Sequence, residues 1–538
     1  MPRTRSIVRM TAFSAGILLL SSLLPQIARA SDEQEIKALL SLAERREQEF
    51  DWEKACDIYE TVLRTERDLP EVRGRYIHSL RRCWQMRRQK DASYRSKVLS
   101  LDYGQAMRLY GNILDNLLDN SLDAKNVSPG ILLQKGIDEL SLALADPNFC
   151  LQHLPSFKTA EAREFRDWLA RVGSTVSSSN RSQAKKQVRE IALAAMSKLQ
   201  MSSTVAIMEL ASGSCYAFDD YTVYLTPNQL RDLCESLKGE YVSVGISLGM
   251  MDGKMMVAGV TPFSPAAETM PPLGKDEQIV SIDKKPIANR PPEAILELLE
   301  GPAGSTVDVE LNSPTNGNRV ITLRRRALFI PSVSYRMRNE VVGYLNIACF
   351  QDTTLQEVDE ALYNLKKSNM KALVLDLRGN TGGLFEVAVE VARRFIDQGV
   401  IVSTQSSSTS TIYHARNQAA LGVPLVVLVD GDTASSAEVL AGALKENKRG
   451  RLVGQATFGK GCTQSIFKLP SGPGGVPTGG LRITVARFFS PDGASYSGRG
   501  VVPHMLVGRV MMPMMNMPAM DHQLEEAILE AQRLMMGS

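Results

Sequence analysis

Apolar residues recur at three different spacings along the chain. Between residues 31 and 200 they follow the period of amphipathic helices. Between residues 228 and 328 the apolar runs are short and separated by turn residues, as in β-strands. From Val341 onward, apolar strands alternate with amphipathic helices. The three patterns predict a helical region, a small β-rich domain and an α/β core.

The helical pattern of residues 31–200 is interrupted twice, at the sequences FDW and DLP. Three successive helices are therefore expected, the third beginning at Pro70. Two helices joined by a short turn resemble one tetratricopeptide unit of about 34 residues, but such arrays usually need at least three units. An ordinary helical bundle is the alternative, and either architecture offers a surface for a protein partner.

The pattern after Val341 predicts βαβ crossovers. The runs ALVLDL and PLVVLVD are apolar almost throughout, as central strands of a covered sheet are. Ligands of an open α/β sheet bind beyond the carboxyl ends of its strands. The turn that follows PLVVLVD is therefore a candidate functional site.

Ser435 and Ser436 lie in that turn and begin a helix whose first residues are small. A serine hydroxyl is a weak nucleophile and requires a base. The helix N-terminus adds free N–H groups and a positive dipole end, which suit an oxyanion. The pattern predicts nucleophilic catalysis by serine, provided that a base lies nearby.

The base is not expected to be a histidine, although the chain has five. Three of them lie in the helical region or the C-terminal tail, and His414 and His504 have no catalytic sequence context. A lysine serves as base when burial keeps its amine neutral. Lys460 lies between two glycines 25 positions after Ser435, and Gln464 is close enough in sequence to hold the lysine amine by a hydrogen bond.

The segment DTASSAEVLAGALKENKRGRLVGQATFGKGCTQ resembles the serine–lysine dyad region of the C-terminal processing (tail-specific) serine peptidases. The resemblance implies that Ser435 is the nucleophile, Lys460 the base and Gln464 its orienting partner. It also implies that no metal or organic cofactor takes part.

The same resemblance implies where the oxyanion donors lie. VLDLRGNTGGL is similar to the family's strand and glycine turn, so that one backbone N–H would come from Gly382 or Gly383. The second donor would be the backbone N–H of Ser436. Together with the motif DDYTVYLTP, the similar segments span about residues 215–510 in the family's order.

The fold implied is α/β, with a ClpP/crotonase-like peptidase core formed by residues 201–227 and 329–510. Residues 228–328 would be an inserted PDZ-like small β-barrel, and residues 31–200 an α-helical N-terminal region. A Met-rich tether and a C-terminal helix would occupy residues 511–538.

Within the β-rich domain, SVGISL resembles the carboxylate loop and binding strand of a PDZ domain, which takes up an extended peptide as an added strand. Val244, Gly245 and Ile246 are the peptide-binding residues expected from this resemblance, with ordinary core packing as the alternative for the aliphatic side chains. Asp276 and Lys284 stand where the family often has turn glycines, and only aspartate tolerates left-handed geometry well.

The function implied is that of a serine endopeptidase that cleaves protein substrates near their free C-termini, which the PDZ domain would select. A non-catalytic scaffold that binds C-terminal peptides through PDZ and helical-repeat modules is the alternative, and an esterase using the same site is a third. A homo-oligomer is compatible with all three.

Residues 1–30 are expected to be a secretory signal peptide. Arg3, Arg5 and Arg9 precede an apolar run, and the sequence ARA ends in a small-x-small cleavage pattern. The mature protein would be periplasmic or secreted, with an uncleaved membrane anchor as the alternative. Removing four arginines and no acid changes the formal charge from +3 to −1, which argues against nucleic-acid binding.

Seven cysteines, an odd number, show no metal-binding spacing. In an oxidising compartment one pair is expected to be able to form a disulfide, with Cys56–Cys83 and Cys215–Cys234 as the candidates.

Overall fold

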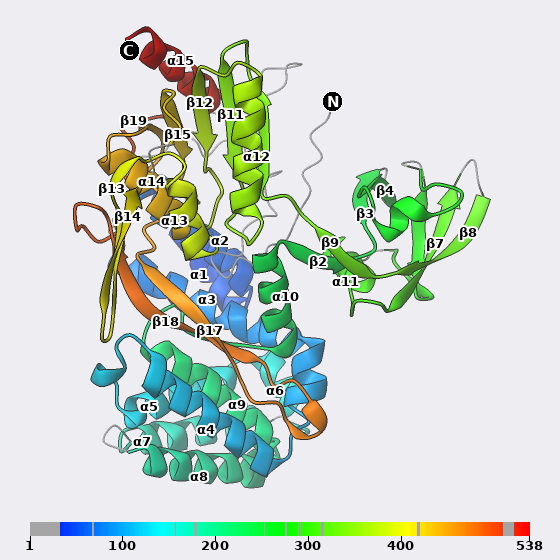
Figure 1. Ribbon diagram of the computed structural model, residues 1–538. Helices are drawn as coiled ribbons and strands as arrows, with labels where there is room; N and C mark the ends of the chain where they lie inside the picture. The colour runs from blue at the N-terminus through cyan, green and yellow to red at the C-terminus, as the bar shows by residue number, and fades with distance from the viewer. Residues whose placement is uncertain are drawn as a thin grey trace. The chain divides into compact units, whose positions relative to one another are not determined.

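The computed structural model describes residues 33–537 apart from 67–68, 157, 177–179, 252, 275–276, 289, 291, 314–316, 417–419 and 509–520. The predicted signal peptide, Asp276 and most of the Met-rich segment lie outside the described residues. The fold is mixed α/β with a helical N-terminal region (Figure 1). Residues 232–332 and 351–357 form one compact unit, and the remaining described residues form a second.

The second unit begins with three helices, α1 (Glu33–Gln48), α2 (Trp52–Thr65) and α3 (Pro70–Lys90). The two predicted breaks are confirmed, because α1 ends at Gln48 and α2 begins at Trp52, while α2 ends at Thr65 and α3 begins at Pro70. Tyr59 and Val62 of α2 are buried against α1 and α3. None of the seven cysteines, all of them among the described residues, forms a disulfide, but the sulfur atoms of Cys56 in α2 and Cys83 in α3 lie 3.8 Å apart.

A helical bundle follows, with α9 (Ser203–Ser214) at its centre, buried from Thr204 onward. Figure 1 shows α9 beside α4 (Tyr103–Asn120), α5 (Pro129–Ala143) and α8 (Arg181–Leu199), while α7 (Thr159–Gly173) packs against α5 and α8. Two buried ion pairs join α3 to this bundle, from Arg82 to Glu139 and from Arg88 to Glu209. The first helices therefore have a fixed attachment to the bundle.

The α/β core is a six-stranded sheet in the order β10-β11-β12-β15-β16-β19. Its strands are β10 (Val333–Met337), β11 (Val342–Ile347), β12 (Ala372–Asp376), β15 (Leu425–Val429), β16 (Arg451–Gly454) and β19 (Met505–Leu506). All neighbours are parallel except β10 and β11. Every residue of β12 and β15 is buried, which confirms the prediction of central strands. Helix α15 (His522–Met536) packs against these strands through Leu524, Ala527 and Ala531.

A second sheet is antiparallel and connects the core to the helical region. It consists of β1 (Val223–Leu225), β13 (Gln398–Ser406), β14 (Ser410–Arg416), β17 (Cys462–Lys468) and β18 (Gly480–Phe489). Strand β18 pairs with β1, β13 and β17. The backbone N–H of Leu122, just after α4, donates to the carbonyl of Thr484 in β18 at 2.9 Å.

The unit formed by residues 232–332 and 351–357 contains one two-stranded and one larger sheet. The first pairs β2 (Glu240–Ser243) with β9 (Arg326–Phe329). The second has the order β3-β4-β5-β7-β8, from β3 (Ile246–Met251), β4 (Lys254–Val260), β5 (Gln278–Ile282), β7 (Thr306–Ser313) and β8 (Gly317–Arg324). The short β6 (Lys285–Pro286) pairs with β5. Helix α11 (Pro292–Leu299) lies within this unit, and α10 (Pro227–Lys238) extends into it.

The core of this unit includes two of the predicted peptide-binding side chains. Val244 is completely buried and Ile246 is 6% exposed, both within its hydrophobic core. Both side chains therefore take part in the core packing that was the alternative, and their contact with a peptide stays a prediction. Gly245 has φ +83°, and a Cβ on it would lie 2.2 Å from the side chain of Ser264, so this position requires glycine. Lys284 takes the left-handed conformation that its turn demands, at φ +61°.

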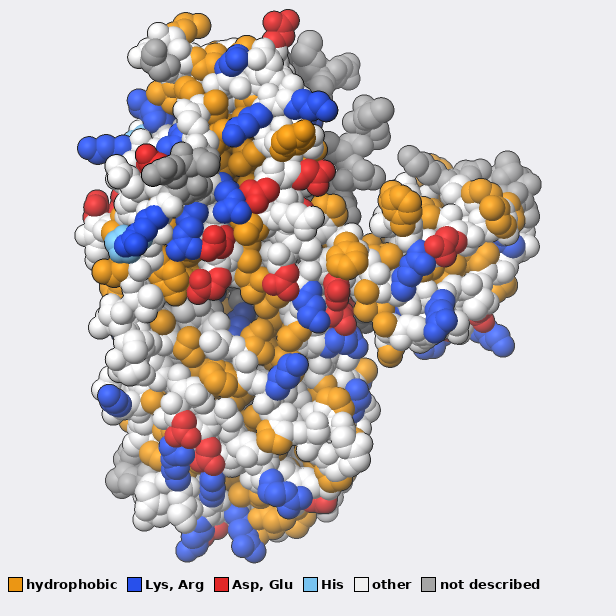
Figure 2. Space-filling model, viewed as in Figure 1, with side chains coloured by type: hydrophobic (Ala, Val, Ile, Leu, Met, Phe, Trp, Pro, Cys, Tyr) orange, Lys and Arg blue, Asp and Glu red, His pale blue; other side chains and the backbone are white. Residues whose placement is uncertain are grey.

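The molecular surface in view mixes both signs of charge. Figure 2 shows Lys and Arg interspersed with Asp and Glu rather than gathered into one extended patch on that face. Among the described residues, no helix is both long and apolar enough to cross a bilayer.

Candidate active site

Ser435 occupies a strained turn between β15 and α14 (Ser436–Glu446). Its φ of +57° is unusual for a residue with a side chain and costs free energy, which is a feature of functional turns. Asp430 stabilises the turn because its Oδ1 accepts the backbone N–H groups of Asp432 and Thr433 at 3.0 and 3.1 Å. The N–H of Gly379 donates to the same oxygen, which joins the serine turn to the glycine turn after β12.

The glycine turn lies against the nucleophile turn. A Cβ on Gly382 would lie 2.9 Å from the Cβ of Ser435 and 3.2 Å from the backbone nitrogen of Ser436, so only glycine allows this approach. The N–H of Gly382 already donates to the side chain of Asn380 at 2.8 Å. Within the described part of the chain, the N–H groups of Gly383 and Ser436 have no such partner. Of the two predicted glycine donors, Gly383 is therefore the better placed to bind an oxyanion.

Lys460 is buried, with 8% of its surface exposed. It lies between Gly459 and Gly461 in the loop from β16 to β17. Burial, together with the charge of Arg482, lowers the pKa of its amine to about 8. The amine lies 4.9 Å from the centre of the Tyr221 ring. Among the described residues, no side chain or carbonyl accepts a hydrogen bond from it.

Glu438 joins the serine and lysine segments and is the functional residue that the sequence argument did not select. Its carboxylate is completely buried. One oxygen accepts the backbone N–H of Ser435 and of Lys460, each at 2.8 Å. The other accepts the hydroxyl of Thr457 and the N–H of Gly459, each at 2.6 Å. Its position three residues after Ser435 matches a capping box, which was the available signal.

Burial raises the pKa of Glu438 to about 7, whereas the four donors favour the carboxylate and limit the increase. The group is therefore ionised above neutral pH, where it neutralises the partial positive charges of the surrounding N–H groups. A buried carboxylate with this set of donors fixes the backbone on both sides of the site.

Among the described residues, no hydrogen bond joins Gln464 to Lys460. It lies on β17, and its Nε2 donates to the sulfur of Cys462 at 3.2 Å and to the hydroxyl of Thr484 at 3.3 Å. Its role in orienting the lysine amine stays a prediction.

The motif DDYT forms the other side of the lysine site. Asp219 accepts the backbone N–H groups of Tyr221 and Thr222 at 2.8 and 2.7 Å, which makes a tight turn before β1. The carbonyl of Tyr221 accepts the Nε of the buried Arg482 at 3.2 Å. Burial lowers the pKa of Arg482 to about 10, which reflects how little water reaches this side of the lysine.

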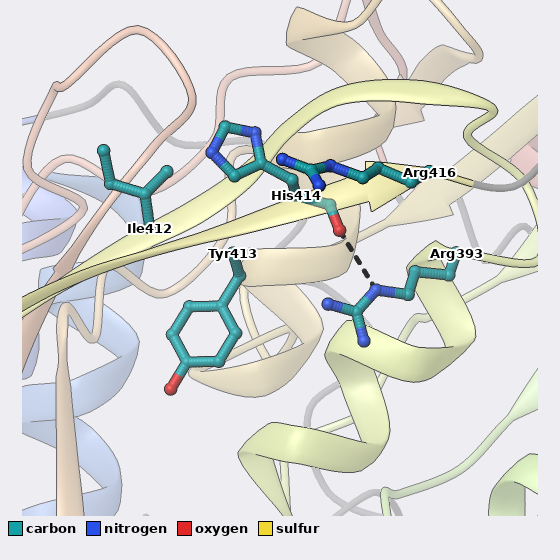
Figure 3. Close-up of a pocket in the computed structure, with 5 residues that line it drawn as sticks. All are labelled: Arg393, Ile412, Tyr413, His414 and Arg416. Carbon is teal, nitrogen blue, oxygen red and sulfur yellow. Dashed lines mark hydrogen bonds between the residues drawn. The ribbon is translucent and has the colours of Figure 1, made fainter.

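The two histidines of the core lie outside this arrangement. His504 accepts the backbone N–H of Leu452 through Nδ1 at 3.0 Å and is bound to β16. His414 lies in a hollow of about 310 Å³ that includes none of the residues above (Figure 3). Its carbonyl accepts the Nε of Arg393, as the dashed line in Figure 3 marks.

Comparison with known proteins assigns the family. The model of peptidase family S41 matches residues 341–507. The chain is 34% identical over 294 residues to a carboxyl-terminal-processing protease of Picosynechococcus sp., covering 54% of this chain and 70% of that protein. It is 30% identical over 306 residues to a carboxy-terminal-processing protease of Bartonella bacilliformis, covering 55% of this chain and 68% of that protein.

A solved structure, the photosystem II D1 C-terminal processing protease, matches with 29% identity and a TM-score of 0.37, covering 62% of this chain and 89% of that chain. The two sequence relatives suffice to define the class, which is that of serine-type peptidases. The chain belongs to peptidase family S41, together with these carboxyl-terminal-processing proteases.

Proposed function

We propose that this protein is an endopeptidase that cleaves protein substrates near their C-termini, with Ser435 as nucleophile and Lys460 as general base. The observation that carries the proposal is the position of Glu438, whose single oxygen accepts backbone N–H groups from both residues. Two segments that are separate in sequence are thereby held at one buried carboxylate. The low pKa of Lys460 supports the role of base, since an appreciable fraction of its amine is neutral near pH 8.

In the proposed reaction, the hydroxyl of Ser435 attacks the scissile carbonyl while neutral Lys460 accepts its proton. The N–H groups of Gly383 and Ser436 stabilise the oxyanion. The lysine ammonium then gives its proton to the leaving amine, and an acyl-enzyme remains on Ser435. Water, deprotonated by the same lysine, releases the acyl group and restores the serine.

The unit formed by residues 232–332 and 351–357 is proposed to be a PDZ domain that selects substrate tails, inserted in a ClpP/crotonase-like core. Strand β3 is the end strand of its sheet, so its outer edge is open to an added peptide strand. The contact of Gly245 with Ser264 fixes the backbone just before this strand. Since Val244 and Ile246 are buried, recognition would use the main chain of β3 together with partly buried side chains such as Leu248, which packs against the same core.

The protein is proposed to act outside the cytoplasm, because its first 30 residues have the pattern of a signal peptide. Edman sequencing or intact mass of the exported protein would locate the new N-terminus after residue 30. A mass that retains residues 1–30 would favour the membrane-anchored alternative.

The test compares the mature protein with its Ser435→Ala and Lys460→Ala variants. Each is added to an unfolded protein that ends in apolar residues, and the products are followed by mass spectrometry. Cleavage by the wild type alone, near the C-terminus, is expected. Tail binding without cleavage by any of the three would indicate the scaffold, and turnover restricted to small esters would indicate the esterase.

A further inference from the structure

The hairpin of α2 and α3 contacts the turn that carries the nucleophile. Arg64, near the end of α2, donates to Oδ1 of Asp432 at 2.5 Å. Asp432 lies three residues before Ser435, and its own N–H donates to Asp430. The Arg64 side chain also donates to Glu60 at 2.9 Å, and only 8% of the Glu60 side chain is exposed. The arginine is therefore oriented from its own helix before it meets the serine turn.

The same hairpin contacts the turn on the lysine side. Arg81 of α3 donates to Oδ1 of Asp220 at 3.3 Å, and its guanidinium lies 4.8 Å from the ring centre of Tyr216. Asp220 immediately precedes Tyr221, whose ring lies below the Lys460 amine. Thus one hairpin makes an ion pair with each of the two turns that flank the proposed dyad.

These two turns belong to different sheets. Ser435 follows β15 of the six-stranded sheet, whereas Tyr221 precedes β1 of the antiparallel sheet. Lys460 itself lies between β16 of the first sheet and β17 of the second. The position of its amine against the Tyr221 ring therefore depends on how the two sheets are held together. A displacement of about 1 Å at a catalytic group is able to reduce the rate about 100-fold. The hairpin is suited to limit such displacement, because buried ion pairs join it to the helical bundle.

We propose that Arg64 and Arg81 are positioning residues, through which the N-terminal helical hairpin holds the serine turn and the lysine side of the site in register. The proposal rests on the proposed Ser435–Lys460 function. Both arginines lie outside residues 341–507, which match the family model. The hairpin of α2 and α3 would then contribute to the rate of peptide cleavage rather than form an independent binding module.

The exposure of the two ion pairs distinguishes an effect on the geometry of the site from an effect on the stability of the fold. The Arg64 and Asp432 side chains are 38% and 31% exposed, and those of Arg81 and Asp220 are 26% and 39% exposed. Pairs of this exposure contribute little to global stability. Their loss should therefore change the rate of turnover more than the melting temperature.

The experiment uses the full mature chain with Arg64→Gln, Arg81→Gln, their combination, and Arg87→Gln as the matched control. Arg87 lies on α3 and pairs with Glu53 of α2 at 3.4 Å, on an exposed part of the same hairpin. We expect kcat to fall about two- to fivefold for each single variant, and by about the product of the two for the double variant, with KM unchanged. Arg64→Lys should recover part of the rate, and Arg87→Gln should match the wild type.

Ser435→Ala run in parallel separates the two proposals. Residual cleavage by that variant would overturn the proposed function itself. If Ser435→Ala is inactive but the Arg64 and Arg81 variants keep a wild-type kcat, the positioning role is wrong. It is also wrong if only KM rises, or if kcat falls in proportion to a melting temperature lowered well beyond that of Arg87→Gln.

Discussion

The backbone N–H groups of Ser435 and Lys460 donate to the same oxygen atom, Oε2 of Glu438, each at 2.8 Å. Each group is the main-chain N–H of a residue assigned to the dyad. This shared acceptor, which belongs to a third residue, limits the distance between the backbones of Ser435 and Lys460. A change in the charge or shape of the Glu438 side chain is therefore expected to alter the backbone positions of both Ser435 and Lys460.

Replacement of Glu438 by glutamine is expected to impair both turnover and stability. One oxygen becomes an NH₂ group, which then faces N–H or O–H donors instead of accepting from them. Each buried donor left without an acceptor costs about 1–3 kcal/mol. We expect Glu438→Gln to lower kcat at least tenfold and the free energy of unfolding by about 2–5 kcal/mol, measured by initial rates and urea melts.

Glu360→Gln on an exposed part of α12 (Thr354–Lys367) is the control for the loss of one carboxylate. It should leave both quantities unchanged. A Glu438→Gln variant with a wild-type kcat would contradict the view that this carboxylate holds the dyad.

The rate of cleavage should rise with pH through about 8. Burial lowers the pKa of Lys460 to about 8, and only the neutral amine accepts a proton from Ser435. Below pH 7 the rate should fall more steeply than one proton predicts, since the pKa of Glu438 is raised to about 7 and its protonation removes an acceptor. The measurement is kcat/KM from pH 5 to 10. A flat profile from pH 5 to 9, with chemistry rate-limiting, would count against lysine as the base.

Individual residues of this site show which features can be predicted from the sequence. The serine turn was predicted from its place after an apolar strand, and Lys460 from its position between two glycines. The choice of Ser435 over Ser436 and the role of the glycine turn came from the family resemblance. The central strands β12 and β15 followed from their continuous hydrophobicity, which burial on both faces demands.

Other features depend on contacts that spacing does not encode. From the sequence, Glu438 has the position of an ordinary capping residue. Its further role depends on the loop from residue 457 to residue 460, which donates three hydrogen bonds to its carboxylate. Arg64 and Asp432 are 368 positions apart, so their pairing is set by tertiary packing alone. Val244 and Ile246 alternate in the way of a half-buried strand, yet both side chains point into the core.

Lys460 is expected to reduce the stability of the folded protein at neutral pH. Its pKa is about 8 when folded and 10.5 in the reference state, so the folded protein binds the proton less tightly than the unfolded chain. The destabilisation is complete below pH 8, at about 3 kcal/mol, and disappears as the pH rises through 10.5. Lys460→Met keeps a similar volume, so it should raise the free energy of unfolding at pH 7 while abolishing activity.

The pH dependence of that gain is the decisive measurement. Urea melts of wild type and Lys460→Met should converge as the pH approaches 10.5. A constant difference across pH 7 to 10 would mean that packing, not the desolvated charge, accounts for the effect.

The ring of Tyr221 is expected to tune the proton affinity of Lys460. An aromatic face within 4.9 Å of an ammonium stabilises the charged form by about 0.5–2 kcal/mol. Tyr221→Leu keeps the site apolar but removes the ring, so the ammonium is disfavoured and the pKa of Lys460 falls. The midpoint of the pH–rate profile should then move to lower pH by about 0.4–1.5 pH units. The plateau rate should fall too, because a weaker base accepts the proton of Ser435 less readily.

Tyr221→Phe is the matched variant, since it retains the ring and loses only the hydroxyl. Its midpoint should equal that of the wild type, as the ring rather than the hydroxyl faces the Lys460 amine. An equal displacement in both variants would assign the effect to the hydroxyl. A midpoint that rises in Tyr221→Leu would mean that water has entered the space and that the ring acts by excluding solvent, because hydration of the amine favours its charged form.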